Sequence, residues 1–337
     1  MMQGYKTHVQ SGILLNANEA SQNVDEAIKQ EIIDAISNLS LNRYPDTTCQ
    51  ELHRLYADIM NVPSSWILSG NGSDQMLGFL IQYYLQDNKT LYTLSPDFSM
   101  YDYYVELNHS KIEKYETNLD GSFDVDAFIS NGKDKKVDMI LFSNPNNPTG
   151  HAITKCEMKK ISEAFKDIPV IFDEAYMEFG KESAICLLKE YPNVFVCRTL
   201  SKAYGLAGIR CGFMLGQQVE KLRDLFIPYA LSSVTQTIAS VVLRHADAYK
   251  ENIATIISER ERMYQEVKGF KQLTMYPSNA NFLFGRSEKK DLLLEMFKEK
   301  NITIRNYEDA SFRITIGTKE ENEMVLDVLR RFEYANS

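Results

Sequence analysis

The chain has 337 residues, of which 44% are hydrophobic and 25% are charged, proportions that are typical of a globular protein with a large core. Its length predicts one large domain with a smaller one beside it. The formal net charge is −9 and the chain has no basic run, which argues against binding to nucleic acid or to an anionic membrane surface.

Cysteine usage and the N-terminal sequence predict a cytoplasmic protein. The five cysteines are scattered and form no CxxC pair, a pattern that fits reduced thiols rather than a disulfide framework. The N-terminal stretch lacks the long apolar segment of a signal peptide. No apolar run approaches the roughly 20 residues that a membrane span requires.

Alternating patterns between about residue 50 and residue 245 predict an α/β domain. Helical spacing is found at 49–60, 72–85 and 99–107. Thr154 begins a further helix, with Glu157 three residues later at the spacing of a capping box. Apolar runs predict strands at 89–96, 111–116, 137–145, 168–176 and 193–200. Because helices separate these strands, we expect a mostly parallel sheet that is covered on both sides.

The pattern changes after residue 245 and predicts a second, smaller α+β domain. A long charged helical stretch is followed by short apolar segments, and Thr318 with Glu321 forms a capping box that begins a last helix. We therefore expect a large domain at 30–245. The small domain consists of 246–337 together with 1–29, which includes an N-terminal arm.

Polar residues follow three of the predicted strands. Asn147 lies just after one strand, Asp173 ends the next, and Lys202 follows the third. Ligands of parallel sheets bind beyond the carboxyl ends of the strands, so we expect these three side chains to share a site.

Lys202 is the most informative of these residues. Burial of a lysine lowers its pKa, and the neutral amine is a nucleophile that forms Schiff bases with carbonyl compounds. Taken alone, a lysine that points into solvent is the more common case. Ser201 and Arg210 lie close in sequence, and both a hydroxyl and a guanidinium suit a phosphate.

A second anion site is predicted where Gly72, Ser73 and Asp74 open a helix, because the free N–H groups of a helix N-terminus attract anions. Together with Ser201 and Arg210 this turn would enclose one phosphate. Glycines at 205, 208 and 212 would let the backbone approach that phosphate closely.

Other side chains fit an aromatic ring beside the phosphate. Asp173 either caps a helix or serves as the counter-charge of a protonated pyridine nitrogen. Tyr176 and Asn147 are candidates to contact a hydroxyl oxygen of such a ring. Phe98 either stacks on the ring face or belongs to the core.

Several motifs in order resemble one family. The segments "GNGSDQ", "NPNNPTG", "DEAYMEF", "RTLSKAYGLAGIRCGF" and "RITIGTKEEN" resemble those of histidinol-phosphate aminotransferases. "LLNANEAS", "NRYPD" and "PSNANFL" extend the resemblance from about residue 13 to the last helix. It implies the PLP-dependent transferase fold type I, in which a large domain has a mostly parallel central sheet flanked by helices and a smaller α+β domain follows at the C-terminus.

The resemblance implies that pyridoxal 5′-phosphate (PLP) is the cofactor and assigns catalytic roles to three residues. Lys202 is similar to the lysine that holds PLP as an internal aldimine and moves the substrate proton. Asp173 is similar to the partner of the pyridine nitrogen. Tyr176, with Asn147, is similar to the contacts of the ring hydroxyl oxygen.

The remaining cofactor contacts follow from the same motifs. Ser201, Arg210 and the backbone at Ser73 and Asp74 resemble the phosphate site. Tyr44 of "NRYPD" resembles a tyrosine that reaches the phosphate site of the neighbouring subunit, which implies a homodimer.

Two arginines are implied to bind substrate. Arg313 resembles the arginine that takes the α-carboxylate of glutamate and the phosphate of histidinol phosphate, and Arg305 resembles a second anion-binding arginine. Alternation of Arg313 with its apolar neighbours, Phe312 and Ile314, also fits an arginine that simply faces water.

The chain departs from the family pattern at two places. Phe98 stands where the family has a tyrosine, so ring stacking is retained while a hydroxyl is lost. Fewer residues precede "LNANE" than in the family, and Tyr5 is the aromatic residue left there to cover the substrate.

The implied activity is a ping-pong transfer of the amino group between L-histidinol phosphate and 2-oxoglutarate, which gives imidazole acetol phosphate and L-glutamate in histidine biosynthesis. An aromatic amino acid aminotransferase and a threonine-phosphate decarboxylase are alternatives within the fold. The second lacks support because no His-Gly-Gly motif lies near the N-terminus.

Functions of other classes have less support. A nucleotide-binding module is disfavoured, because no GxGxxG opens a βα unit. No metal site is expected, since the five histidines show no ligand spacing.

Overall fold

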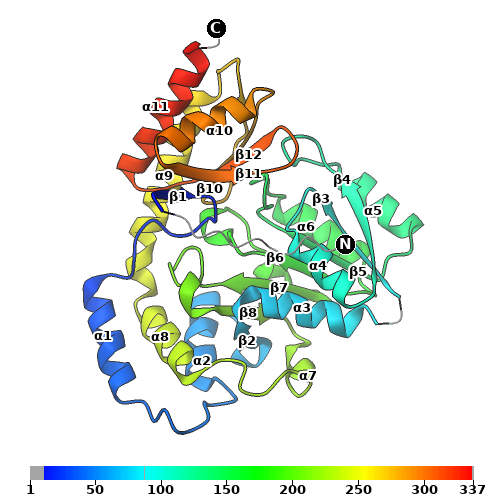
Figure 1. Cartoon of the computed structure of the whole chain (residues 1–337). Helices are drawn as coiled ribbons and strands as arrows, with labels where there is room; N and C mark the ends of the chain where they lie inside the picture. Colours follow the sequence, from blue (N-terminus) through cyan, green and yellow to red (C-terminus); the bar gives the residue numbers. More distant parts are fainter. Residues whose placement is uncertain (1–10, 87, 336–337) are drawn as a thin grey trace.

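A computed structural model describes residues 11–86 and 88–335, and two β-sheets organise it (Figure 1). The larger sheet contains β2 (Ile67–Asn71), β3 (Thr90–Ser95), β4 (Lys111–Glu116), β5 (Met139–Ser143), β6 (Val170–Asp173), β7 (Val194–Thr199) and β8 (Cys211–Leu215). The smaller sheet contains β1 (Ile13–Leu15), β9 (Thr274–Met275), β10 (Phe282–Arg286), β11 (Ile302–Asn306) and β12 (Ser311–Thr315).

The larger sheet is mostly parallel, which confirms the prediction from the apolar runs. Its strand order is β2-β8-β7-β6-β5-β3-β4. All neighbouring pairs from β7 to β4 are parallel, whereas β8 runs antiparallel to both β7 and β2. All residues of β5, β6, β7 and β8 are buried. The antiparallel strand β8 was not predicted from the sequence.

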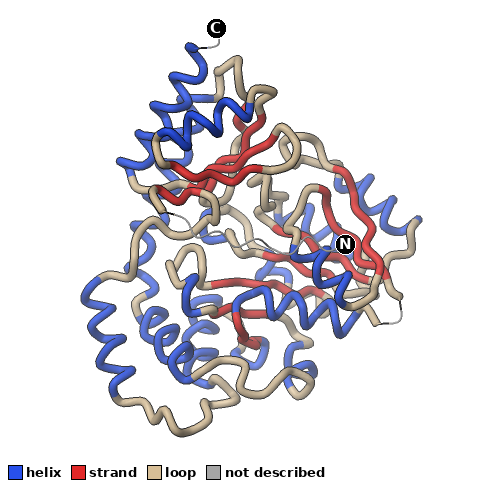
Figure 2. The backbone as a smooth tube through the Cα atoms, viewed as in Figure 1, coloured by secondary structure: helices blue, strands red, loops and turns tan. Residues whose placement is uncertain are grey.

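Helices cover both faces of this sheet, as the blue tubes of Figure 2 show around the red strands. The helices of the part that carries the larger sheet are α1 (Glu26–Ser37), α2 (Gln50–Met60), α3 (Gly72–Tyr84), α4 (Met100–Leu107), α5 (Val125–Asp134), α6 (Lys155–Ala164), α7 (Val219–Arg223) and α8 (Ser233–Arg244). Residues of α3, α4 and α7 pack with one set of strand side chains, and residues of α1, α2, α5, α6 and α8 pack with the alternate set. This arrangement is a three-layer sandwich with the sheet in the middle.

The smaller sheet has the order β1-β11-β12-β10-β9 and lies at the top of Figure 1, with helices α9 (Tyr249–Val267), α10 (Lys290–Glu299) and α11 (Lys319–Ala335). Its edge strand β1 comes from the N-terminal part of the chain and pairs in parallel with β11. We keep the domain boundaries near residues 29 and 245 as a proposal, which the pairing of β1 with β11 supports.

Short 3₁₀ helices complete the secondary structure at η1 (Ser64–Trp66), η2 (Met177–Phe179), η3 (Ala184–Leu187), η4 (Ala207–Ile209) and η5 (Ala246–Ala248). Both predicted capping boxes are present. The Thr154 hydroxyl accepts a hydrogen bond from the backbone nitrogen of Glu157, whose carboxylate accepts from Thr154 in return. Thr318 and Glu321 make the same reciprocal pair before α11. These contacts satisfy backbone donors that the first turn of a helix leaves free.

Two glycines allow the turn before α3 to lie against the loop that precedes β8. A Cβ atom at Gly212 would lie 2.1 Å from the backbone nitrogen of Ser73. Gly72 has a φ of +77°, and its Cβ would lie 2.6 Å from a guanidinium nitrogen of Arg210. Gly208 differs, because nothing lies within 4 Å of its Cβ position. Gly208 lines the cleft, and the expectation that glycines 205, 208 and 212 let the backbone approach a phosphate stays a prediction.

Substitution of Gly212 by alanine should lower the free energy of unfolding by about 1–3 kcal/mol, because the added methyl group would overlap backbone atoms that cannot move freely. Gly208→Ala is the matched control and should leave stability nearly unchanged. Urea unfolding of both variants beside the parent protein measures the difference. Equal unfolding midpoints for the two variants would contradict the close approach.

Candidate active site

A cleft of about 1150 Å³ lies between the carboxyl ends of the parallel strands and the smaller sheet. Its lining brings together nearly all of the residues that the sequence pointed to. The predicted residues that line it are Ser73, Asp74, Phe98, Asn147, Asp173, Tyr176, Ser201, Lys202, Arg210, Arg305 and Arg313.

Lys202 lies in the cleft and is half-buried, so it does not extend freely into solvent. It follows β7, and its Nζ donates a hydrogen bond to the carbonyl oxygen of Ala17 at 2.9 Å. The same nitrogen lies 5.8 Å from the centre of the Tyr176 ring. Burial, together with the positive charge of Arg313, lowers the pKa of Lys202 to about 8. A lysine of this kind is a nucleophile and a base near neutral pH.

Asp173 ends β6 and is almost fully buried, with 3% of its surface exposed. Its carboxylate accepts hydrogen bonds from the hydroxyl group of Tyr101 at 2.9 Å and from the backbone nitrogen of Ala175 at 3.2 Å. Burial raises the pKa of Asp173 to about 7, although the hydrogen bond from Tyr101 opposes the shift. A cationic ligand beside it would keep this carboxylate ionised.

Tyr176 is buried and faces the same part of the cleft. Its hydroxyl oxygen accepts a hydrogen bond from Nδ2 of Asn18 at 3.0 Å, and its ring packs edge-on against Phe282. Burial raises the pKa of Tyr176, so the phenol keeps its proton at neutral pH. Asn147 lies on the loop after β5, where its backbone nitrogen donates to the Ser143 hydroxyl at 2.9 Å.

Four predicted phosphate contacts lie where the turn before α3 meets the loop before β8. The backbone nitrogen of Gly72 donates to the carbonyl oxygen of Arg210 at 3.1 Å, and the Arg210 side chain pairs with Asp74 at 2.9 Å. Ser201 is buried, and its hydroxyl oxygen accepts a hydrogen bond from Thr199 at 2.9 Å. The cluster offers one guanidinium, hydroxyl groups and the N-terminus of a 13-residue helix to an anion.

The two predicted substrate arginines lie on neighbouring strands of the smaller sheet. Arg313 on β12 and Arg305 on β11 are directly opposite each other. Arg313 is only 6% exposed, so the alternative that it faces water is wrong. Its guanidinium donates to the side-chain oxygen of Asn147 and to the carbonyl oxygen of Asn16, and it lies 5.0 Å from the Phe282 ring centre. Its Nε is buried and has no hydrogen-bond partner among the described residues.

Among the described residues, the predicted cofactor contact Tyr44 does not line the cleft. Tyr44 is 81% exposed and stacks on Tyr229 with ring centres 4.6 Å apart, so it contributes nothing to the site of its own chain. Tyr5, the expected cover of the substrate, lies outside the described residues.

Comparison with known proteins decides the family. A family model described as aminotransferase class I and II matches residues 10–329. The chain belongs to this family. It is 33% identical over 325 residues to a histidinol-phosphate aminotransferase of Clostridium kluyveri, and the match covers 95% of this chain and 92% of that protein. A histidinol-phosphate aminotransferase of Pyrococcus furiosus is 34% identical over 325 residues, with the same coverage of both chains.

A solved structure shares the fold of this aminotransferase. It is the histidinol-phosphate aminotransferase of Sinorhizobium meliloti in complex with pyridoxal-5′-phosphate, which superposes with a TM-score of 0.86 at 21% identity. The superposition covers 97% of this chain and 92% of that one. The motif-based resemblance, the predicted fold class and the predicted enzyme class are thereby confirmed, and the protein is a transaminase.

Three residues that contact the predicted site were missed. Asn18 binds Tyr176, Tyr101 binds Asp173, and Asp97 lines the cleft beside Phe98. The Asp97 carboxylate accepts hydrogen bonds from the Ser143 side chain and from the backbone nitrogen of Phe98, and burial raises its pKa to about 8. Asn18 lies within "LLNANEAS", and Asp97 and Tyr101 flank the predicted stacking residue Phe98, so proximity to these predicted features was the signal that could have found them.

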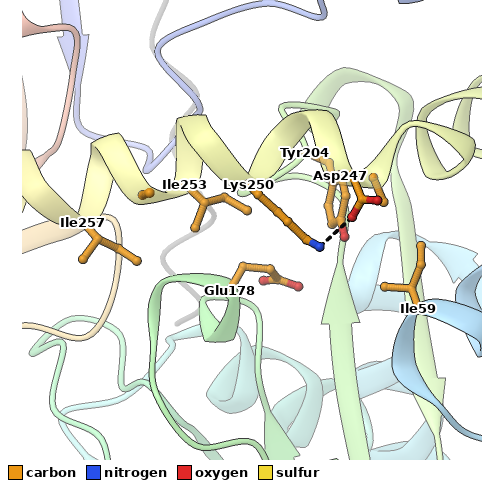
Figure 3. A pocket seen from close by; sticks show the side chains of 9 residues that line it. Ile59, Glu178, Tyr204, Asp247, Lys250, Ile253 and Ile257 are labelled. Carbon is orange, nitrogen blue, oxygen red and sulfur yellow. Dashed lines mark ion pairs between the residues drawn. The ribbon is translucent and has the colours of Figure 1, made fainter.

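A smaller pocket of about 500 Å³ lies behind the site, between α9 and the loops after β6 and β7 (Figure 3). Lys250 and Asp247 form an ion pair at its edge at 2.6 Å, and Glu178 lies on its floor. Buried Arg198 pairs with Glu178 and with Glu174 at 2.9 Å each. This trio fixes the segment that carries Tyr176 against β7, the strand that leads to Lys202.

The described part of the chain contains neither a cluster of metal-ligating side chains nor a helix able to span a membrane. Across residues 11–86 and 88–335 we find no group of three or more His, Cys, Asp or Glu side chains arranged to hold a metal ion. No helix within these ranges combines the length and the apolar character needed to cross a bilayer.

The lowered pKa of Lys202 predicts its chemical reactivity. Acetylating reagents attack the neutral amine, so in dialysed protein the modification of Lys202 should rise with pH through a midpoint near 8, whereas ordinary lysines titrate near about 10.4. Peptide mass spectrometry at each pH measures this. Arg313→Gln removes a positive charge that lowers the Lys202 pKa, and it should move the midpoint upward. A midpoint near 10 in the parent protein would show that the ammonium is not destabilised by its surroundings.

Proposed function

We propose that this aminotransferase binds PLP and transfers the amino group of L-histidinol phosphate to 2-oxoglutarate, with imidazole acetol phosphate and L-glutamate as products. One observation carries the proposal: Arg313 is buried and lines the same cleft as Lys202 and Tyr176. An arginine held there is suited to the carboxylate or phosphate of an amino donor whose amino group must reach Lys202. The names of the two curated relatives at 33% and 34% identity support the same substrate.

The residues of the cleft fit PLP in their donor chemistry. The cluster of Ser73, Ser201 and Arg210 offers donors to a phosphate, and the glycine at 72 leaves space beside the guanidinium. Among the described residues, the hydrogen-bond partners of the buried Asp173 carboxylate are the Tyr101 hydroxyl and the Ala175 backbone nitrogen, neither of which is cationic, and this suits a protonated pyridine nitrogen. Tyr176 and the amide of Asn147 are then the contacts of the ring hydroxyl oxygen, and Phe98 is the stacking residue. We assign these roles as part of the proposal.

When bound, PLP supplies an aldehyde that accepts the amino group and a ring that withdraws electrons from it. The protein's own residues do the remaining work. Lys202, with its lowered pKa, would remove a proton from the substrate α-carbon and then, as an ammonium group, deliver it to the carbon of the PLP aldehyde group. Asp173 keeps a negative charge where the ring nitrogen must stay protonated. Arg313 and Arg305 bind the phosphate of the donor, L-histidinol phosphate, and then the carboxylates of the acceptor, 2-oxoglutarate. One site therefore serves both halves of a ping-pong reaction.

The proposal includes a homodimer and a cytoplasmic location. Tyr44 is exposed, stacked on Tyr229 and absent from the cleft of its own chain, as expected for a side chain that serves the neighbouring subunit. The five cysteines are all unpaired, which suits a reducing compartment.

Replacement of Lys202 by alanine should reduce transamination by about 10²- to 10⁴-fold or more, because the variant lacks the amine that we assign to move the α-carbon proton. Lys221→Ala, on the exposed side of α7, is the matched control and should retain full activity. A coupled glutamate assay measures both. Normal turnover in Lys202→Ala would remove this residue from the catalytic role.

Single-turnover reactions test the substrate. The protein loaded with PLP should lose the visible absorbance band of the bound cofactor when L-histidinol phosphate is added without an acceptor, and 2-oxoglutarate should restore it. Phenylalanine and phosphothreonine serve as comparison donors, and we expect each to react at least about tenfold more slowly. A faster reaction with phenylalanine would replace the proposed substrate by an aromatic one, and release of CO₂ from phosphothreonine would indicate the decarboxylase.

A further inference from the structure

Three consecutive residues between β1 and α1 contact three different residues of the cleft. We call Asn16–Asn18 the strap. The Asn16 carbonyl accepts a hydrogen bond from Arg313, and the Ala17 carbonyl accepts one from Lys202. The Asn18 amide donates to Tyr176. The strap therefore joins the smaller sheet, through β1, to the residues at the carboxyl ends of β6 and β7.

Asn18 is the most constrained residue of the strap. Its exposed fraction is 0%, and its backbone has a φ of 55°, a conformation that asparagine tolerates better than most residues. The backbone nitrogen of Asn18 donates to the Thr315 hydroxyl at 3.0 Å, and its carbonyl accepts from Nδ2 of Asn281 at 3.1 Å. These partners belong to β12 and to the loop before β10.

Thr315 determines which way the Asn18 amide faces. The Thr315 hydroxyl oxygen already accepts from a backbone nitrogen, which can only donate, so the hydroxyl hydrogen is available for the side-chain oxygen of Asn18 at 3.1 Å. With its oxygen toward Thr315, the amide presents its NH₂ group to Tyr176. If the amide were reversed, the Thr315 hydroxyl hydrogen would lose its acceptor among the described residues, which favours this direction of the hydrogen bond to Tyr176.

This direction matters because a phenol has one hydrogen. Since the Tyr176 oxygen accepts from Asn18, its own hydrogen is free for an acceptor elsewhere in the cleft. We propose that Asn18, oriented by Thr315, is a positioning residue that directs the Tyr176 hydroxyl hydrogen toward the cofactor ring oxygen. The proposal deepens the proposed function and rests on it. Tyr176 also faces the charges of Arg313, Asp173 and Lys202, which stay unchanged when Asn18 is replaced.

Affinity for the cofactor tests the proposal through a double-mutant cycle. Asn18→Asp keeps the side-chain shape and replaces the obligatory donor by a carboxylate that takes the Tyr176 hydrogen for itself. At pH 8 the dissociation constant of the cofactor-free protein for PLP should rise about five- to tenfold, the value of roughly one hydrogen bond. In the Tyr176→Phe background the same substitution should change the dissociation constant less than twofold. A residue with only a structural role would weaken binding equally in both backgrounds.

Two further variants complete the experiment. Thr315→Val removes the hydroxyl that orients Asn18 and should shift the dissociation constant in the same direction, again only when Tyr176 is present. Asn193→Asp is the matched control. Asn193 is buried just before β7, at the end of that strand away from the cleft, and its Nδ2 donates to the backbone carbonyls of Phe165 and Ile168. It should lower the melting temperature without weakening PLP binding.

The outcomes separate the two proposals. Unchanged PLP affinity in folded Asn18→Asp or Thr315→Val would overturn the positioning role, and so would equal losses with and without Tyr176. If Asn18→Asp does not fold, the Thr315→Val cycle decides alone. Failure of the parent protein to bind PLP would instead overturn the proposed function.

Discussion

Strand direction is the constraint on which the site depends. Five neighbouring parallel strands of the described chain place their carboxyl ends at one edge of the larger sheet, and the residues that follow them enter the cleft. The single antiparallel strand β8 begins at the edge where its neighbour β7 ends, so Arg210, which immediately precedes it, lies at that same edge. The seven residues between Lys202 and Arg210 then span one loop. A parallel β8 would place Arg210 at the opposite end of the sheet.

The chemistry of the cleft depends on charges held where water is scarce. Burial favours the neutral form of Lys202 and also raises the pKa of Asp173, so the same surroundings prepare a base and a carboxylate that awaits a cation. The buried ion pairs of Arg198 with Glu174 and Glu178 hold the segment after β6, which carries Tyr176, against β7. Replacing one member of such a trio leaves an uncompensated buried charge. The rigidity of the site is therefore electrostatic as well as steric.

Much of the larger sheet was predictable, because β5, β6 and β7 are unbroken apolar runs and the capping boxes mark helix starts. The reactive polar residues Asn147, Asp173 and Lys202 were predictable because each ends or follows one of these apolar runs. The strand β8 was not, since its residues lie within a glycine-rich motif that indicates a loop. The resemblance placed Arg313 in the substrate site, whereas its alternation with apolar neighbours left a solvent-facing arginine open; that alternative fails because every residue of β12 is buried. Asn18 and Tyr101 reach the site only through packing of distant segments, which local periodicity does not encode.

The register of the smaller sheet has a consequence for the protein without ligand. Arg305 and Arg313 are directly opposite on adjacent strands, and like charges in that position repel. An anion bound between them relieves this repulsion, so any anion of suitable size, including one that is never transformed, stabilises the folded state by an amount that grows with the logarithm of its concentration relative to its dissociation constant. The melting temperature of this aminotransferase is therefore a property of its solvent as well as of its sequence.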